Sequence, residues 1–426
     1  MIKVLVFPCG SEIALEIHSA LKFNKAVRLF GVSSVPDHGE YVYRHYRQIG
    51  AQVDSPDFIE QLNALIDEWE IDIVLPAHDS VVLALAEQRA ELKTLAAVPE
   101  LAVARLCRNK NATYACFASS DFVPRSIVEP AEGIYPIFAK PAVGQGSQGA
   151  ERVMERARHV QLLAGSVEYV FSEYLPGIEC TVDCISDSNG ELLHLSPRVR
   201  ERVKSGISVA TQPLPVEARI QSIAGQIASA LRIRGAWFFQ LKRDARGQWM
   251  LLEVAPRVAG SMALSRNLGV NYALLTLYAY LNMPFHVLAQ DFPIRLDRAL
   301  GNRFRVAHQY DCVYLDLDDT LLVDGRVHPL MAALLYQWQA QKVSIILVTR
   351  HARCPRQTLS EYHLAESLFE SIVHIQDGGP KSAVIDDSRR AIFIDDSWRE
   401  RLDVSRQCGI PVFDIDALEQ LLDCKA

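Results

Sequence analysis

The sequence of 426 residues lacks the features that mark several specialised classes of protein. No apolar run reaches the length of about 20 residues that a helix needs to cross a bilayer. No Lys/Arg-rich tract occurs, and the net charge of −7 argues against general binding to nucleic acid or to an acidic membrane, because both require a basic surface. We therefore expect neither nucleic acid nor a membrane as a partner. Internal repeats and low-complexity segments are also absent.

The cysteines lack the spacing of a metal site. There are nine, and no Cys-x-x-Cys pair occurs among them. We interpret them as reduced thiols of a cytoplasmic protein. The amino terminus, MIKVLVFPCGSEIALEIHSALKF, is not typical of a signal peptide, because Pro8, Gly10 and Glu12 interrupt its apolar run. It predicts a buried strand followed by an amphipathic helix.

Short apolar runs alternate with helical patterns along most of the chain. KVLVF precedes SEIALEIHSALKF, IDIVLP precedes SVVLALAEQRAEL, and AIFID precedes SWRERLDVSRQCG. This alternation predicts an α/β fold with parallel sheets. Because 426 residues exceed one ordinary hydrophobic core, we expect several domains. The motifs described below place them at 1–100, at 101–300 with a split near residue 170, and at 302–426.

The first candidate site is the segment IFAKPAVGQGSQGA, residues 137–150. It predicts a strand that ends at Lys140 and a loop with glycines at 144, 146 and 149. Glycines expose backbone N–H groups and allow close approach of a ligand, and the lysine supplies positive charge for a phosphate. The segment has neither the P-loop pattern nor the dinucleotide-binding pattern. Taken alone, it is equally well interpreted as a flexible hairpin.

Two later segments favour a nucleotide site. VFSEYLPGIECTVDCI predicts two strands around a Pro-Gly turn, which Glu173 and Glu179 flank. WFFQLKRDARGQWMLLEVAPRVAGS predicts a hairpin with Gln240 on one strand and Glu253 on the other, followed by Arg257. Carboxylate and amide oxygens near an arginine suit a Mg²⁺ ion that bridges phosphates.

With these motifs in this order, residues 1–300 resemble the ATP-grasp superfamily, especially carboxylate–amine ligases and carbamoyl-phosphate-synthetase-like domains. The resemblance includes the small amino-terminal domain that precedes the grasp fold. It implies ATP and Mg²⁺ as cofactors. It also implies a reaction in which a small carboxylate is activated as an acyl phosphate and then coupled to an amine or a similar nucleophile.

The resemblance further implies roles for individual residues. Lys110 opens the first grasp subdomain and reaches the phosphates, and Lys140 contacts phosphate and adenine. The loop over the triphosphate contains Gly144, Gly146, Ser147 and Gly149, and the adenine hinge contains Glu173, Tyr174 and Leu175. Glu179 binds ribose, Gln240 and Glu253 are magnesium ligands, and Arg257 steadies the acyl phosphate.

One position departs from the family pattern. The family usually reads Glu-x-Asn-Pro-Arg, whereas this sequence reads EVAPR, with Ala255 in place of the asparagine. Alanine cannot coordinate a metal, so one Mg²⁺ would be held loosely or by a nearby side chain. The departure bears more on complete ligase activity than on nucleotide binding.

Two further groups of polar residues have alternative interpretations. His78 and Asp79 follow a predicted strand, where α/β sheets bind ligands, but capping of a helix by Asp79 is the commoner role. SPRVRERVKSGISV carries basic residues that share one face of a predicted strand. They form a solvated face, or one or two of them bind a substrate carboxylate or phosphate; the residues are Arg198, Arg200, Arg202 and Lys204.

The segment YLDLDDTLLVDG, residues 314–325, begins as a buried strand and continues into clustered carboxylates, Asp316, Asp318 and Asp319. Like charges this close repel one another, so each needs hydration, a cationic partner or a metal. Three more signals follow. IILVTRH predicts a strand ending at Thr349, GGPKSAVI contains Lys381, and AIFIDDSWRER predicts a strand ending in Asp395 and Asp396.

In type, order and strand context these four signals resemble the haloacid-dehalogenase-like hydrolases, over residues 302–426. The resemblance implies that Asp316 attacks a phosphate monoester to form an aspartyl phosphate, while Asp318 acts as acid and base. Thr349 and Lys381 would hold the phosphoryl oxygens, and Mg²⁺ would be bound by Asp316, Asp318, Asp395 and Asp396. Asp319 is predicted to organise the turn. The short gaps between motifs predict a Rossmann-like domain without a large cap.

The leading hypothesis is a chain with two enzymes, an ATP-grasp ligase followed by a phosphatase. One alternative is a phosphatase whose grasp module only binds nucleotide or substrate, which Ala255 favours. Another is a nucleotide-sensing regulator without catalysis. The carboxylate, the amine and the phosphate monoester cannot be named from these residues, and a homodimer is one assembly that the sequence leaves open.

Overall fold

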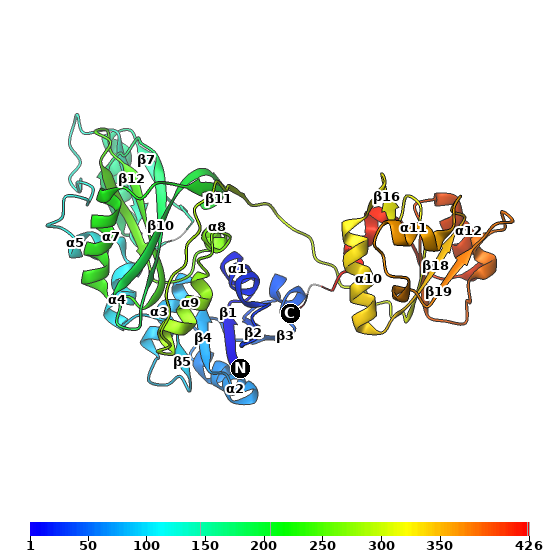
Figure 1. Cartoon of the computed structure of the whole chain (residues 1–426). Coiled ribbons are helices and arrows are strands. Elements are labelled where there is room, and N and C mark those ends of the chain that lie inside the picture. The colour runs from blue at the N-terminus through cyan, green and yellow to red at the C-terminus, as the bar shows by residue number, and fades with distance from the viewer. Residues whose placement is uncertain (145, 205, 424, 426) are drawn as a thin grey trace. The chain divides into compact units, whose positions relative to one another are not determined.

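The computed structural model describes residues 1–144, 146–204, 206–423 and 425. They form two compact units, which divide between Leu300 and Gly301 (Figure 1). A finer division of the first unit near residues 100 and 170 stays a prediction. Among the described residues, no helix combines the length and apolar character that crossing a membrane requires.

The first unit begins with a five-stranded parallel sheet in the order β3-β2-β1-β4-β5. The apolar runs predicted as strands form the central strand β1 and its neighbour β4, and both are largely buried. Helix α1 begins where the Ser11 hydroxyl accepts a hydrogen bond from the Ala14 N–H, and it buries Ile13 and Ile17. The elements are β1 (Ile2–Phe7), α1 (Glu12–Leu21), β2 (Val27–Ser33), β3 (His45–Gln48), α2 (Phe58–Trp69), β4 (Ile73–Pro76), α3 (Asp79–Glu87) and β5 (Leu95–Ala96).

The middle of the chain departs from the predicted parallel pattern, as the hairpins expected there require. It forms a three-stranded sheet, β7-β6-β8, and a six-stranded sheet, β13-β12-β9-β10-β11-β14, in which neighbouring strands are antiparallel. The strands are β6 (Ile137–Pro141), β7 (Glu151–Val153), β8 (Tyr169–Glu173), β9 (Glu179–Ser186), β10 (Leu192–Lys204), β11 (Ile207–Pro213), β12 (Gly235–Arg243), β13 (Trp249–Ala255) and β14 (Leu296–Asp297).

Alternation along β12 shows why the six-stranded sheet is covered on both faces. Trp237 and Phe239 pack in the cluster that contains the apolar residues of α7, whereas Phe238 packs in the cluster that contains those of α1 and α9. Gln240 lies on the same face as Phe238 and therefore reaches the candidate site. The helices of this part are α4 (Leu101–Arg108), α5 (Lys110–Cys116), α6 (Arg156–Leu163), α7 (Ala218–Leu231), α8 (Ala263–Arg266) and α9 (Tyr272–Tyr280).

The second unit is a five-stranded parallel sheet in the order β19-β18-β15-β20-β21. Strand β15 lies between β18 and β20, so the residues that follow these three strands meet at one edge of the sheet. Apolar clusters cover both faces. The elements are β15 (Cys312–Leu315), a β16–β17 hairpin (Leu322–Val323 and Arg326–Val327), α10 (Pro329–Gln341), β18 (Ser344–Thr349), α11 (Pro355–Glu361), β19 (Ser371–His374), β20 (Ala391–Ile394), α12 (Trp398–Cys408) and β21 (Val412–Phe413).

Candidate functional site

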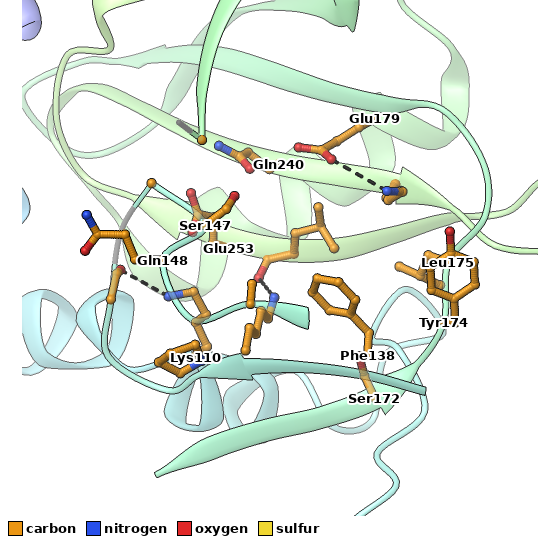
Figure 2. Close-up of a pocket in the computed structure, with 18 of the residues that line it drawn as sticks. Lys110, Phe138, Ser147, Gln148, Ser172, Tyr174, Leu175, Glu179, Gln240 and Glu253 are labelled. Carbon is orange, nitrogen blue, oxygen red and sulfur yellow. Dashed lines mark hydrogen bonds and ion pairs between the residues drawn. The ribbon is translucent and has the colours of Figure 1, made fainter. Parts of the chain in front are cut away.

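A pocket of about 860 Å³ lies between the three-stranded and six-stranded sheets of the first unit (Figure 2). Almost all the nucleotide and metal residues predicted for this unit line it: Lys110, Lys140, Gly144, Gly146, Ser147, Glu173, Tyr174, Leu175, Glu179, Gln240 and Glu253. The two exceptions are Gly149, which packs beside Pro141, and Arg257.

The strand pairing explains why residues far apart in sequence meet here. Strand β6 carries Lys140 into the pocket opposite Val170 of β8. The chain then crosses from β8 to β9 through Tyr174 and Leu175, which form a wall of the pocket. Strands β12 and β13 place Gln240 directly opposite Glu253, so the two predicted magnesium ligands share one face of a hairpin.

The two ends of the pocket differ in chemistry (Figure 2). At one end Phe138, Tyr174 and Leu175 gather, with the Arg152 guanidinium 4.3 Å from the centre of the Tyr174 ring. The opposite end holds Lys110 and Ser147, together with Gln148 and Glu253. An apolar, aromatic end and an end with a lysine beside the glycine loop match the base and the phosphates of a nucleotide. Glu173 also lies at the pocket, but its Oε1 accepts a hydrogen bond from the Arg125 N–H at 2.9 Å.

Lys140 is buried, and its partners are neutral oxygens. Its Nζ donates to the Tyr114 hydroxyl at 2.9 Å and to the Leu252 carbonyl at 2.8 Å. Burial lowers the pKa of Lys140 to about 8, an effect that the carboxylates of Glu253 and Glu179 only partly offset. The structure thus holds an ammonium group whose charge becomes better compensated when an anion enters the pocket.

The glycine loop is held by cations at one end and by close backbone packing further along. Lys110 Nζ donates to the Gly144 carbonyl at 3.3 Å, and Arg108 donates to the same carbonyl at 3.2 Å. Gly146 and Gly206 both have positive φ, and a Cβ on Gly206 would lie 2.0 Å from the Gly146 carbonyl carbon. The loop and the β10–β11 turn therefore meet through their backbones, which only glycine permits here.

Of the four basic residues predicted on one strand face, only Arg200 lines the pocket. It donates to Gln240 Oε1 at 2.8 Å and to the Gly206 carbonyl at 2.6 Å, and it pairs with Glu179. Arg198 is buried in a two-bond ion pair with Asp183, and the exposed Arg202 pairs with Asp297. Strand alternation could not separate these residues, because it places all of them on the same face.

A smaller pocket of about 390 Å³ shares Lys110, Gly144 and Glu253 with the first. Ala255 and Asp79 also line it. The structure corrects one interpretation here, and it adds a partner to a second residue. Asp79 is not the helix cap, since the ring of His78 occupies that position. Arg257 is engaged by Asp79 through two hydrogen bonds of 2.7 Å, and it does not line the first pocket.

The Asp79–Arg257 pair keeps both groups charged. Burial alone would raise the pKa of the Asp79 carboxyl, but the guanidinium of Arg257 outweighs it and the pKa lies below its usual value. If Arg257 contacts an acyl phosphate, it would therefore do so while it remains paired with Asp79.

In the second unit, a buried lysine joins two of the predicted carboxylates. Lys381 Nζ lies 2.5 Å from Asp316 Oδ1 and 2.7 Å from Asp395 Oδ2. Burial raises the pKa of Asp316 to about 7, although Lys381 opposes the shift. Asp316, Asp395 and Asp396 each place one oxygen within 4.8 Å of the others, a donor set that suits Mg²⁺. All three residues follow β15 or β20, the two adjacent strands.

The remaining predicted residues of this unit follow β15 or end β18, the strand beside it. The Asp318 carboxylate lies outside that cluster and contacts His351 instead. Thr349 is fully buried at the end of β18. Asp319 has a left-handed backbone conformation, φ +55°, in the turn that it was predicted to organise. Sequence reasoning assigned no role to Thr320, whose hydroxyl donates to Asp396 and accepts from the Asp396 N–H, and which thereby links the first and last motifs.

Comparison with known proteins identifies the middle of the chain. Residues 166–298 match the family model described as ATP-grasp in the biosynthetic pathway with Ter operon. The chain contains an ATP-grasp domain. ATP-grasp enzymes use ATP with Mg²⁺. The matched residues include the hinge, Glu179, Gln240 and Glu253, and they end before the second unit.

Solved structures share the ATP-grasp fold. The biotin carboxylase domain of 2-oxoglutarate carboxylase from Hydrogenobacter thermophilus, with MgADP and bicarbonate, is 16% identical, with a TM-score of 0.54 over 68% of this chain and 71% of that one. N5-carboxyaminoimidazole synthetase from Staphylococcus aureus, with ADP, is 15% identical, with a TM-score of 0.57 over 70% of this chain and 82% of that one. At such identities the likeness shows the fold alone.

The pKa of Lys140 predicts that nucleotide binding to the ATP-grasp domain takes up a proton in mildly alkaline solution. Below pH 8 the ammonium is already protonated, whereas above pH 8 the neutral amine must gain a proton to face a phosphate. Affinity for MgADP should therefore fall as the pH rises from 8 to 9. Calorimetry at pH 8.5 in two buffers of different ionisation enthalpy measures the uptake directly. Lys140→Arg is the control, because arginine keeps its charge; equal uptake in both proteins would contradict the assignment.

Proposed function

We propose that the first unit is an ATP- and Mg²⁺-dependent ligase that activates a small carboxylate as an acyl phosphate and couples it to an amine or a similar nucleophile. The observation that carries the proposal is the alignment of Gln240 and Glu253 across one hairpin, in the pocket that the glycine loop and Lys110 also line. The match of residues 166–298 to an ATP-grasp family supports it.

The oxygen donors present fit a magnesium ion. Glu253 offers a carboxylate oxygen, and Gln240 offers an amide oxygen. In this structure the amide oxygen accepts a hydrogen bond from Arg200. Glu253 and Gln240 would hold the metal, which when bound neutralises charge on the phosphates. Lys140 and Lys110 add fixed positive charge, and the N–H groups of the glycine loop orient the terminal phosphate.

The smaller pocket is the place that we assign to the carboxylate. It adjoins the phosphate end through Lys110 and Glu253, and Arg108 lies in its wall. A carboxylate oxygen would attack the terminal phosphorus and ADP would leave. The amine nitrogen would then attack the acyl carbon, lose a proton and release phosphate. The residues of the chain position these groups and exclude water, which would otherwise hydrolyse the acyl phosphate.

Removing the charge of Lys140 should separate the two activities of the chain. Lys140→Ala is expected to lower amine-dependent release of ADP at least a hundredfold, because the buried cation beside the phosphates is lost. Phosphatase activity should stay within about twofold, since that site lies in the other unit. Lys93→Ala, an exposed lysine of the first unit, is the control. A folded Lys140 variant that loses both activities together would contradict the modular assignment.

Ala255 leads to a second prediction. It lines the smaller pocket next to Glu253, where the family places a ligating asparagine. Ala255→Asn restores a third oxygen and should lower the Mg²⁺ concentration needed for half-maximal ADP release severalfold, without unfolding the protein. A magnesium titration of both proteins measures this. An unchanged midpoint would mean that another group already provides the oxygen, or that the grasp module only binds nucleotide.

We further propose that the second unit hydrolyses a phosphate monoester through an aspartyl phosphate. The Lys381 bridge between Asp316 and Asp395 supports this proposal, because it joins the predicted nucleophile, phosphate anchor and metal ligand in one buried cluster. Asp316 Oδ would attack phosphorus, and Asp318 would protonate the leaving oxygen. Asp318 would then take a proton from the water that attacks the phosphoaspartate, which releases phosphate and frees Asp316. A bound Mg²⁺ would offset the charge of the three clustered carboxylates.

Acid-quench trapping tests the covalent intermediate. With a labelled phosphate monoester, wild type should carry label on the protein in the presence of Mg²⁺. Asp316→Asn should carry none and lose nearly all turnover, because an amide is a poor nucleophile. Asp318→Asn should retain label but release phosphate slowly, because breakdown needs a base. Turnover that survives Asp316→Asn would exclude this mechanism.

A further inference from the structure

The proposed acid–base residue differs from its neighbours in exposure. Asp316, Lys381 and Thr349 are buried, so packing fixes their orientation. The Asp318 side chain is 51% exposed, and the turn that follows it does not enclose it. A carboxylate on an open surface samples several rotamers, whereas proton transfer to a leaving group requires one geometry. Another group must therefore hold the Asp318 carboxylate in one orientation.

His351 contacts both oxygens of this carboxylate. Its ring Nδ1 lies 2.9 Å from Asp318 Oδ1 and 3.0 Å from Oδ2. Among the described residues, His351 makes the only side-chain hydrogen bonds to the Asp318 carboxylate. When Asp318 is ionised its oxygens only accept, so Nδ1 is then the donor, which leaves the other ring nitrogen for a second partner.

His351 is itself held by three hydrogen bonds to other residues. Its Nε2 lies 2.8 Å from the Oγ1 of Thr358, which is buried on α11. Its carbonyl accepts from the ring of His374, the last residue of β19, at 2.7 Å. Its backbone N–H donates to Thr349 Oγ1 at 3.1 Å. The His351 side chain is only 12% exposed, and rotation of its ring would break the contact with Thr358 as well as those with Asp318.

We infer that His351 is a positioning residue for the proposed phosphatase: it fixes the Asp318 carboxylate in the orientation that delivers a proton to the leaving oxygen. This inference rests on the phosphatase function proposed above for the second unit. The backbone bond from His351 to Thr349 also ties the orientation of the acid to a predicted phosphate anchor. His351 touches neither the nucleophile Asp316 nor Lys381 in the hydrogen-bond network.

If His351 has this role, its replacement should lower the reaction rate by a factor that depends on the leaving group. Cleavage of an alkyl phosphate needs protonation of a strongly basic alkoxide, whereas p-nitrophenolate leaves without help. His351→Ala should lower kcat for an alkyl phosphate about tenfold to a hundredfold, less than removal of the acid itself, because Asp318 remains. The burst of p-nitrophenolate, which reports phosphorylation of Asp316 alone, should change less than about threefold, whereas breakdown of the phosphoaspartate, in which Asp318 is the base, should slow for both esters. KM should stay nearly constant for both, because the phosphate anchors Thr349 and Lys381 are intact.

Two conservative variants separate positioning from packing. The amide nitrogen of asparagine can take the place of Nδ1, whereas that of glutamine reaches the place of Nε2. His351→Asn should therefore recover part of the alkyl phosphate rate, and His351→Gln should recover less. Thr358→Val, which removes the second ring contact and keeps the shape, should show a weaker form of the same leaving-group dependence. His363→Asn, an exposed histidine of the same unit, is the control.

The outcomes distinguish this inference from the proposed function. Full-length protein and both esters are used throughout, with thermal unfolding to verify that each variant is folded. An equal loss of the phosphorylation rate for both esters in a folded His351→Ala, or no advantage of asparagine over glutamine, would overturn the positioning role while the phosphatase stands. Wild type that hydrolyses neither ester and carries no label at Asp316 would overturn the phosphatase and this role with it.

Discussion

Buried lysines organise both candidate sites, and their partners set what each can do. Lys381 is enclosed by the carboxylates of Asp316 and Asp395, which hold its pKa above the usual value although burial alone would lower it. Lys140 has only a hydroxyl and a carbonyl as hydrogen-bond acceptors, so burial dominates and its pKa falls. A charge that is poorly compensated within the protein gains most from an incoming anion. Lys381 is thus paired within the protein, whereas Lys140 is available to pair with a phosphate.

Ion pairs within the protein determine which of the arginine side chains can contact a ligand. Arg198 and Arg257 each donate two hydrogen bonds to one buried or partly buried carboxylate. Loss of either carboxylate would leave a buried charge unpaired, which is strongly destabilising. Arg200 instead bridges Glu179 and Gln240 inside the pocket, so it holds the side chains expected to meet ribose and metal. Arginines on one strand face therefore have structural and ligand-facing roles side by side.

The fold and the chemistry rest on different observations. Structures of carboxylases and of a carboxyaminoimidazole synthetase share the fold at 15–16% identity, and one fold supports many substrates. The reaction proposed for the first unit depends on particular groups, the opposed Gln240 and Glu253 and the two lysines. The phosphatase proposal depends on the cluster around Lys381 and stands without support from the family match, which ends at residue 298.

The sequence by itself determined which residues reach each site wherever the information is local. The predicted hairpin placed Gln240 and Glu253 on paired strands, and the position of Asp316 and Asp395 just after apolar runs placed them at strand ends, since these patterns follow from backbone geometry. Only the tertiary structure decided the partners. Asp79 and Arg257 are 178 residues apart, and Asp318 and His351 are 33 apart. No local pattern distinguishes a paired arginine from a free one, because pairing depends on which distant strand packs alongside.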